Sequence, residues 1–330
     1  MITRRSLLLA TLGRQRDARR KAIGWLWREQ SVDGGWHSRT YGLLRSGQSL
    51  TPLVLLALLE ADSELPTSRV RKAVDFLRRH IDPHGALGRA QSELPDYPNY
   101  ATSLAVIALH KLGQCDAKMI EYLLGQQFTE DNGWERDHPV YGAWGMGGDR
   151  VHPPHTGHVD LSMTRHVLEA LTTQLPSDHP CFAKARIFLK RCQNPDGGFF
   201  FSTVIDEANK AGHDGRGWRS YGTATVDGIL ASIAAGAETD SAARWLRTHH
   251  QYREVPGFHG EAYARFRAGL RYYYTASSAR ALRAIGMIPK WREALGATQR
   301  PDGSWRNPET LVKEDDPLIA TALALRALSA

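Results

Sequence analysis

The chain has 330 residues, of which 42% are hydrophobic and 23% are charged, a balance typical of a folded globular protein rather than a disordered one. Its uninterrupted apolar runs are all shorter than the roughly 18 residues that a membrane helix needs. Its three cysteines are too few and too scattered for a disulfide framework. We therefore expect a cytoplasmic protein with one large domain or two smaller ones.

The net charge of +7 is concentrated at the start of the chain. Residues 1–21 hold seven basic residues and one acidic residue, which leaves the remainder nearly neutral. Nucleic-acid binding is not expected, because it requires basic residues clustered over a binding face. The basic segment can instead contact an anionic membrane surface. Residues 1–16 resemble a degenerate twin-arginine export signal, but the apolar stretch is short and no cleavage site follows, so export is the less favoured alternative.

From residue 17 onward, the chain alternates two kinds of predicted helix. The first kind carries apolar residues on one stripe only, as where Val70, Ala73, Val74 and Leu77 recur at helical spacing beside basic residues, which is typical of a surface helix. In chain order, these helices are expected at residues 17–30, 66–80, 117–127, 179–193, 241–250 and 289–299.

The second kind is rich in leucine and alanine and apolar on nearly all sides, which predicts buried helices. Each contains a threonine followed seven residues later by a leucine, at Thr51/Leu58, Thr102/Leu109, Thr164/Leu171, Thr223/Leu230, Thr275/Leu282 and Thr321/Leu328.

Alternation of six surface helices with six buried ones predicts two concentric rings, an all-α (α/α)6 toroid that forms a single domain over residues 17–330. No two-residue alternation is long enough to build a sheet. An open helical solenoid is the structural competitor. The uneven spacing of the repeats and the polar connection at residues 134–160 favour the closed ring.

A second motif follows four of the surface helices. A glutamine precedes an Asp-Gly or Asn-Gly turn and then an aromatic residue, at residues 30–36, 127–134, 193–199 and 299–305. Glycine after a helix ends it, and the aromatic residue can fix the turn against the next repeat. These segments resemble the QW motifs of the squalene–hopene cyclase and protein prenyltransferase β-subunit superfamily.

The resemblance covers residues 17–330 and implies the α/α toroid of that superfamily. It also implies an isoprenoid substrate, which some members cyclise by protonation and others transfer with zinc; further members are known only as squalene-cyclase-like repeat proteins. The acidic DxDDT motif of the cyclases aligns with Asp160-Leu161-Ser162-Met163-Thr164. Ser162 stands where the proton donor is expected, so this motif is degenerate and Asp160 is the acid that remains.

Candidate site residues lie just before the repeated threonines, because the leading ends of the inner helices are expected to meet at one mouth of a central cavity. The candidate catalytic residues are Asp160, His155, His158, Asp96, Asp315 and Asp316. The candidate substrate-binding residues are Tyr97, Tyr100, Trp144, Trp218, Arg219, Tyr221, Tyr272, Tyr273 and Tyr274. Helix capping and packing are the alternative roles for all of them.

Neither a metal nor a cofactor is expected. His152, His155, His158 and Asp160 carry suitable donor atoms for zinc, but Pro153 and Pro154 place them in a loop without helical ligand spacing. No cysteine lies in a leading end, as the zinc-dependent prenyltransferases would require. Asp315 and Asp316 are followed by Pro-Leu-Ile, so no DDxxD motif is present to bind a diphosphate through magnesium.

The leading hypothesis is therefore a terpene-cyclase-like protein that binds a polyprenyl or triterpenoid substrate in an apolar cavity and cyclises it by protonation. A carbohydrate-active toroid, with residues such as Tyr100, His155 and Arg219 in an open polar groove, is one alternative. A non-catalytic toroid that binds a lipid or a protein is another, and the degenerate acid motif favours it.

Overall fold

The computed structural model describes residues 17–62, 64–89 and 96–330. In these ranges the regular structure consists of helices and isolated β-bridges, without strands. The basic segment 1–16, with its resemblance to an export signal, lies outside the described residues. None of the helices in the described ranges has the length and hydropathy needed to cross a membrane.

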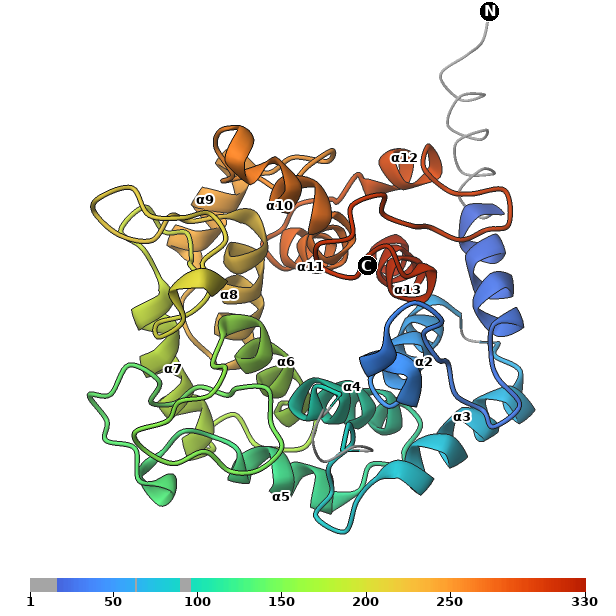
Figure 1. Ribbon diagram of the computed structural model, residues 1–330, viewed down its shortest axis with the longest axis horizontal. Helices are drawn as coiled ribbons and strands as arrows, with labels where there is room; N and C mark the ends of the chain where they lie inside the picture. The colour runs from blue at the N-terminus through green and yellow to red at the C-terminus, as the bar shows by residue number, and fades with distance from the viewer. Residues whose placement is uncertain (1–16, 63, 90–95) are drawn as a thin grey trace, which may run out of the picture.

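In the described part of the chain, six helices form the inner ring around the centre of the molecule (Figure 1). Each packs against the next around the ring, and the last of them packs against the first. They are α2 (Leu50–Ala61), α4 (Pro98–Lys111), α6 (Leu161–Leu171), α8 (Gly222–Ala234), α11 (Arg271–Ala284) and α13 (Pro317–Ser329). The predicted toroid is thereby confirmed, and the open solenoid is wrong.

Six further helices within the described ranges form the outer ring, and each packs its apolar side against the inner ring. In α3, for example, Ala73, Val74, Phe76 and Leu77 are buried while the basic residues face outward. The outer helices are residues 17–28, α3 (Thr67–His80), α5 (Ala117–Gly125), α7 (Pro180–Cys192), α9 (Asp240–His249) and α12 (Trp291–Gly296).

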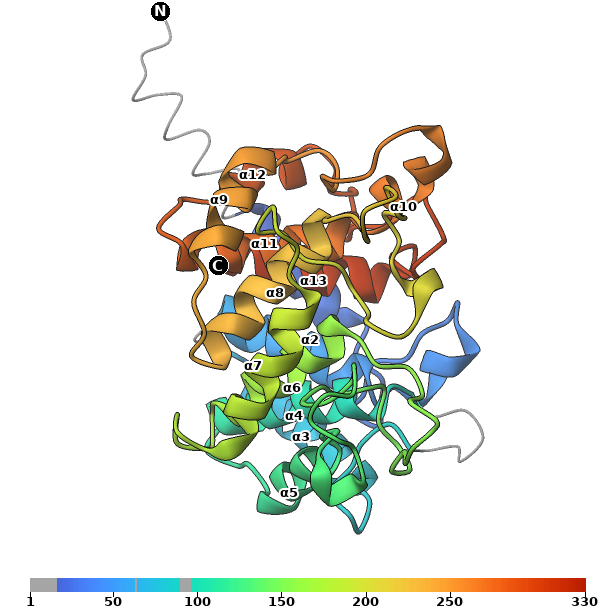
Figure 2. The same cartoon turned by 90° about the vertical axis from the view of Figure 1, so that its left-hand side faces the viewer.

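The connections contain elements that the periodicity did not predict. A short helix, α10 (Ala264–Gly269), precedes α11. Single 3-10 turns occur at η1 (Gly42–Ser46), η2 (Glu130–Asn132), η3 (Asp206–Ala208) and η4 (Glu261–Tyr263). Figure 2 shows the longer connections, including the segment with α10, gathered on one side of the ring.

Four of the six repeated threonines have a common structural role, whereas the hydroxyl of Thr275 donates to the carbonyl of Arg271 within its own helix. The hydroxyl of Thr51 accepts a hydrogen bond from the backbone N–H of Trp36 at 3.0 Å, and Thr321 does the same for Trp305 at 2.9 Å. Thr102 and Thr164 make equivalent bonds. In the fourth repeat the hydroxyl of Thr225 accepts the equivalent bond, from the backbone N–H of Phe199, so Thr225 rather than Thr223 corresponds to these threonines.

The glutamine of each turn motif fastens the turn to the following outer helix. The Nε2 of Gln30 donates to the carbonyls of Gly34 and Arg69, both at 3.0 Å, and so reaches α3. The Nε2 of Gln299 donates to the carbonyl of Ala18 at 2.8 Å. This last bond joins the sixth repeat to helix 17–28 and completes the outer ring.

The second copy of the motif is longer than its sequence indicates. Gln127 donates to the carbonyls of Gly142 and Cys181, and the indole of Trp144, not Trp134, donates to Leu123 as Trp36 does to Leu26. A Cβ on Gly142 would lie 2.0 Å from the Lys184 carbonyl of α7, so only glycine fits there. The assignment of Trp134 to the motif is wrong, because an insertion separates Gln127 from its turn.

Candidate functional site

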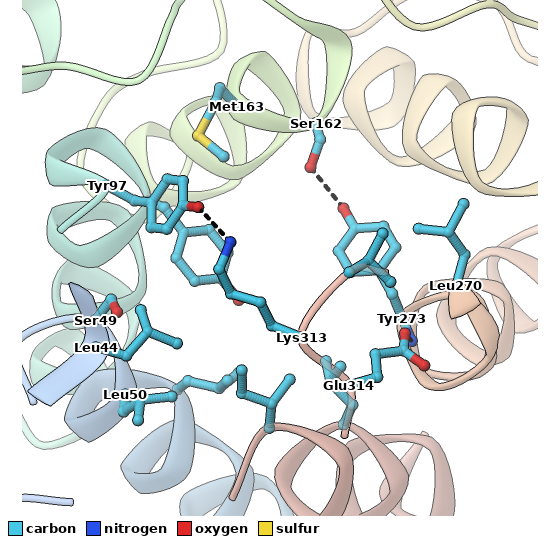
Figure 3. A pocket seen from close by; sticks show the side chains of 15 residues that line it. Leu44, Ser49, Leu50, Tyr97, Ser162, Met163, Leu270, Tyr273, Lys313 and Glu314 are labelled. Carbon is cyan, nitrogen blue, oxygen red and sulfur yellow. Dashed lines mark hydrogen bonds between the residues drawn. The ribbon is translucent and has the colours of Figure 1, made fainter. Parts of the chain in front are cut away.

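The central pocket lies at the leading ends of five inner helices and has a volume of about 210 Å³ (Figure 3). Its walls are mainly apolar, with a few polar groups among them. The lining residues are Leu44, Ser49, Leu50, Leu53, Tyr97, Tyr100, Ser162, Met163, Leu270, Tyr273, Val312, Lys313, Glu314, Ile319 and Leu323. Pockets for drug-sized ligands measure roughly 300–1,000 Å³, so this one fits a short apolar chain or one end of a longer chain.

Three of the predicted substrate-binding residues line this pocket: Tyr97, Tyr100 and Tyr273. Ser162 and Met163, from the segment aligned with the acid motif, line it as well. The leading end of α8 supplies no lining residue, so the predicted residues Trp218, Arg219 and Tyr221 are not part of the pocket. The prediction of a mouth at the leading ends therefore holds for five of the six inner helices.

The candidate acid Asp160 has a structural role at the start of α6. Its carboxylate caps α6 by accepting the backbone N–H of Met163 at 2.8 Å, and His158 Nδ1 lies 3.1 Å from its other oxygen. Asp160 is buried but does not line the central pocket, and His155 is exposed in the loop. Their catalytic roles stay predictions.

The other predicted acids also cap a helix or form hydrogen bonds with loop residues. Asp316 caps α13 through the N–H of Leu318, and it accepts the hydroxyl of Ser38. Asp315 accepts the hydroxyl of Tyr41. Asp96 accepts the hydroxyls of Ser46 and Ser49, and burial raises its pKa. None of these three carboxylates is part of the pocket lining.

The remaining predicted substrate-binding residues lie between the helices or in a connection. Trp144 is fully buried in the turn motif, and Tyr221 packs against Phe258. Tyr272 is buried, and the hydroxyl of Tyr274 is hydrogen-bonded to His250 Nδ1 at 2.8 Å. Trp218 and Arg219 are half-buried in a connection, where Trp218 packs against His213. These residues lie outside the central pocket.

Among the described residues, Glu314 is the acidic residue that lines the pocket, and it was not among the candidate catalytic residues although it precedes two of them. Its carboxylate accepts the first free backbone N–H groups of α11, from Tyr272 at 2.8 Å and Tyr273 at 2.7 Å, and also the amide of Asn307 at 2.9 Å. Burial raises the pKa of Glu314 to about 7, against the opposing effect of these bonds. A carboxyl with this pKa is partly protonated near neutral pH.

Behind the pocket wall, the hydroxyl of Tyr273 connects several buried polar groups. It lies 2.9 and 3.0 Å from the two carboxylate oxygens of Asp227, and 2.7 Å from the hydroxyl of Ser162. Arg165 Nη1 lies 3.5 Å from Asp227 Oδ1. We call these four residues, Ser162, Arg165, Asp227 and Tyr273, the Tyr273 cluster. Burial raises the pKa of Asp227 to about 7, although Arg165 and Tyr273 oppose the rise.

Further ion pairs lie across the centre of the ring beyond the Tyr273 cluster. Glu169 pairs with Arg165 at 3.2 Å and with Arg280 at 3.0 Å. Burial alone would raise the pKa of Glu169, but the two guanidinium groups hold it below its ordinary value. Arg326 pairs with Glu60. A cavity of only about 10 Å³ remains among these groups, so the central pocket is closed on this side.

His166 also belongs to this buried network. Its Nδ1 lies 2.8 Å from the carbonyl of Ser162 and its Nε2 lies 3.2 Å from Arg165 Nη1. Since a carbonyl only accepts and a guanidinium only donates, Nδ1 carries the proton and Nε2 accepts. Burial and the charge of Arg165 lower the pKa of His166 well below its ordinary value, so the ring is neutral.

Within the described residues, no three histidine, cysteine, aspartate or glutamate side chains gather closely enough to hold a metal ion. His152 lies in the same loop as His155 and His158 but is bonded to the carbonyl of Asn132.

The closed inner ring and the outer helices packed around it define the fold of this chain as an α/α toroid. No family model matches the chain, and no match was found among the curated proteins. Among solved structures, the chain is similar to the type II terpene cyclase MstE from Scytonema. A variant of MstE in complex with geranylgeranyl dihydroxybenzoate matches with 14% identity and a TM-score of 0.58 over 98% of each chain.

A second MstE structure, without substrate, matches with 13% identity and a TM-score of 0.57 over 98% of each chain. A protein from Actinoplanes matches with 18% identity and a TM-score of 0.57, over 95% of this chain and 98% of that one. At such low identity the similarity shows the shared fold alone, and the chain has the fold of the type II terpene cyclases.

Proposed function

We propose that this chain binds an isoprenoid in the central pocket and cyclises it by protonation, with Glu314 as the acid. The observation that carries the proposal is a buried carboxyl in the wall of a pocket that is otherwise mainly apolar. MstE, whose fold the chain shares, binds geranylgeranyl dihydroxybenzoate as its substrate, which supports an isoprenoid ligand.

The surroundings of Glu314 suit a proton donor. Burial favours its neutral, protonated form. When the proton leaves, two N–H groups at the start of α11 and the amide of Asn307 stabilise the carboxylate without rearrangement. Oε2 accepts two of these bonds and Oε1 only one, so Oε1 retains a position for the proton.

The reaction would be an isomerisation. The proton of Glu314 adds to one carbon of an alkene, and the π electrons of a second alkene close the ring onto the resulting cation. The rings of Tyr97, Tyr100 and Tyr273 line the pocket and can stabilise the positive charge through their faces. The last cation loses a proton to restore the balance, so no co-reactant is consumed.

The two alternative functions are a carbohydrate-active toroid and a non-catalytic binding protein. A carbohydrate-active toroid needs an open polar groove, whereas the lining here is dominated by leucine, valine, isoleucine and tyrosine side chains. A non-catalytic toroid would retain an isoprenoid without converting it. Contact between the basic start of the chain and an anionic membrane surface stays a prediction.

The test is to incubate the purified protein with squalene, farnesol and farnesoic acid and to analyse retained and converted lipid by mass spectrometry. Glu314→Gln should retain lipid but abolish conversion, while the exposed Glu135→Gln serves as control. Because Gln presents an N–H to the α11 amides, circular dichroism must first show that the variant is folded. Wild-type conversion should also decline above about pH 7.

Asp160→Asn provides the competing test, since asparagine caps a helix as well as aspartate does. The assignment to Asp160 expects conversion to be lost in this variant, whereas the assignment to Glu314 expects it to be kept. Retention of lipid without conversion by the wild-type protein would contradict catalysis and support the binding protein. Absence of both retention and conversion would contradict the whole proposal.

A further inference from the structure

Lys313 extends across the mouth of the central pocket. Its Nζ donates a hydrogen bond to the hydroxyl of Tyr97 at 3.0 Å, and its aliphatic stem lines the pocket (Figure 3). The ammonium group lies 5.5 Å from the ring centre of Tyr97 and 6.0 Å from that of Tyr41. Among the described lining residues, Lys313 is the one cation.

The ammonium group has unused hydrogen-bonding capacity. A lysine carries three N–H donors, and the bond to Tyr97 uses one of them. No carboxylate in the described ranges lies within ion-pair distance of Nζ, although three acidic residues follow directly in the sequence. Asp315 is bonded to Tyr41, Asp316 caps α13, and Glu314 is bonded to α11, so each of them has other partners.

The backbone at both ends of this contact is strained. Tyr97 has φ 46° and Lys313 has φ 65°, and in the described ranges these are the non-glycine residues with positive φ. The left-handed conformation is unfavourable for residues with a Cβ, and such strain often accompanies a binding function. Glycine would satisfy the same turn at position 313, so what the lysine contributes is its side chain.

We propose that Lys313 binds a singly charged carboxylate at the end of the isoprenoid, so that the ligand is a prenyl chain bearing one acidic group. This inference rests on the proposed function, since it assigns the other end of the same ligand. The apolar chain occupies the pocket toward Tyr273, and the carboxylate lies at the mouth against Nζ and the hydroxyl of Tyr97.

The charges at the mouth favour one negative charge over several. A single ammonium group neutralises a single carboxylate, whereas a diphosphate would leave excess charge. That excess would lie on the same side of the ring as Asp96, Asp315 and Asp316, which are all buried. Repulsion from these side chains should therefore disfavour a diphosphate.

The test measures binding of three probes with the same C15 chain, namely farnesoic acid, farnesol and farnesyl diphosphate, by titration calorimetry on the full chain. The wild type should bind farnesoic acid about tenfold more tightly than farnesol. Lys313→Met, which keeps the aliphatic stem, should lose this preference and bind the two probes equally. The matched control is Lys210→Met, since Lys210 lies over the ring of Phe201 outside the pocket.

Equal binding of farnesoic acid and farnesol by the wild type would overturn this inference while leaving isoprenoid binding intact. Tighter binding of farnesyl diphosphate than of farnesoic acid would overturn the assignment to a single charge. If none of the three probes binds, the proposed function itself fails. A loss of farnesoic acid affinity in Lys210→Met equal to that in Lys313→Met would show that the effect is not local to Lys313.

Discussion

The guanidinium group of Arg326 in α13 forms two hydrogen bonds, at 2.8 and 3.0 Å, with the carboxylate of Glu60 in α2. These are the last and first helices of the inner ring, so this ion pair spans the junction at which the ring closes. Both groups are largely withdrawn from water, with exposed side-chain fractions of 6% for Arg326 and 21% for Glu60.

Removal of one partner should weaken the ring at this junction. Glu60→Ala leaves a buried guanidinium group without its carboxylate, and we expect the free energy of unfolding to fall by about 2–3 kcal/mol. Urea denaturation of the variant and the wild type at neutral pH measures this difference in the free energy of unfolding. The control is Lys184→Ala, which removes a more exposed ion pair with Glu130 and should cost under about 1 kcal/mol. Equal losses in the two variants would contradict a special role for the junction.

The insertion after Gln127 leads to a prediction about two tryptophans. Trp144→Phe removes the 2.7 Å bond from the indole to the buried carbonyl of Leu123 and should cost about 2 kcal/mol. Trp134→Phe removes a weaker, partly exposed bond of 3.3 Å to Val151 and should cost less. Thermal or urea unfolding of both variants measures the two losses of stability. A larger loss for Trp134→Phe than for Trp144→Phe would show that Trp134 is the tryptophan of the turn motif.

Stability should depend on pH through the buried carboxyls. The pKa of Asp227 rises from 3.8 in its ordinary state to about 7, so the folded protein binds an additional proton between these values. The stability that this proton provides is present below about pH 4 and is lost as the pH rises through 7, by at most about 1.4 kcal/mol per pH unit. Glu314, with a pKa of about 7, contributes in the same direction.

Asp227→Asn isolates this effect, because asparagine remains neutral at every pH. Its stability relative to the wild type should increase when urea denaturation is repeated at pH 5, 6, 7 and 8. Groups with lowered pKa, such as Glu169, act in the opposite direction at lower pH and are common to both proteins. A constant difference between the two proteins across this range would show that Asp227 is ionised throughout.

The strained backbone of Lys313 leads to a stability prediction that does not depend on any ligand. Lys313→Gly and Lys313→Ala both remove the side chain, but only glycine adopts φ 65° without a steric penalty. We expect the glycine variant to be more stable than the alanine variant by about 1 kcal/mol. Chemical denaturation of the two variants tests this, and equal stabilities would contradict the strain.

The ring could be predicted from the sequence because its signals are local. In five of the six inner helices a threonine accepts a bond from the preceding turn, and the glutamine of each turn motif bonds within its turn and to the next outer helix. Sequence spacing identified the wrong equivalent residue in two places. One is Trp134, where the repeat is longer, and the other is Thr223, which lies two residues before Thr225.

The candidate site was less predictable because its contacts join distant repeats. Ser162 and Tyr273 are 111 residues apart, and Asp227 lies 46 residues before Tyr273. Asp227 also lies within α8 rather than at its leading end, where the search was directed. Glu314 precedes Asp315 and Asp316, but only the path of the chain into α13 determines which of these carboxyls faces the pocket.

Contact between α13 and α2 gives every inner helix a neighbour on both sides. In an open array of repeats, the end units have one neighbour and can fray independently of the rest. A circular arrangement has no end unit, so the release of any one repeat must break two interfaces at once. Denaturation should consequently proceed as one all-or-none transition rather than repeat by repeat.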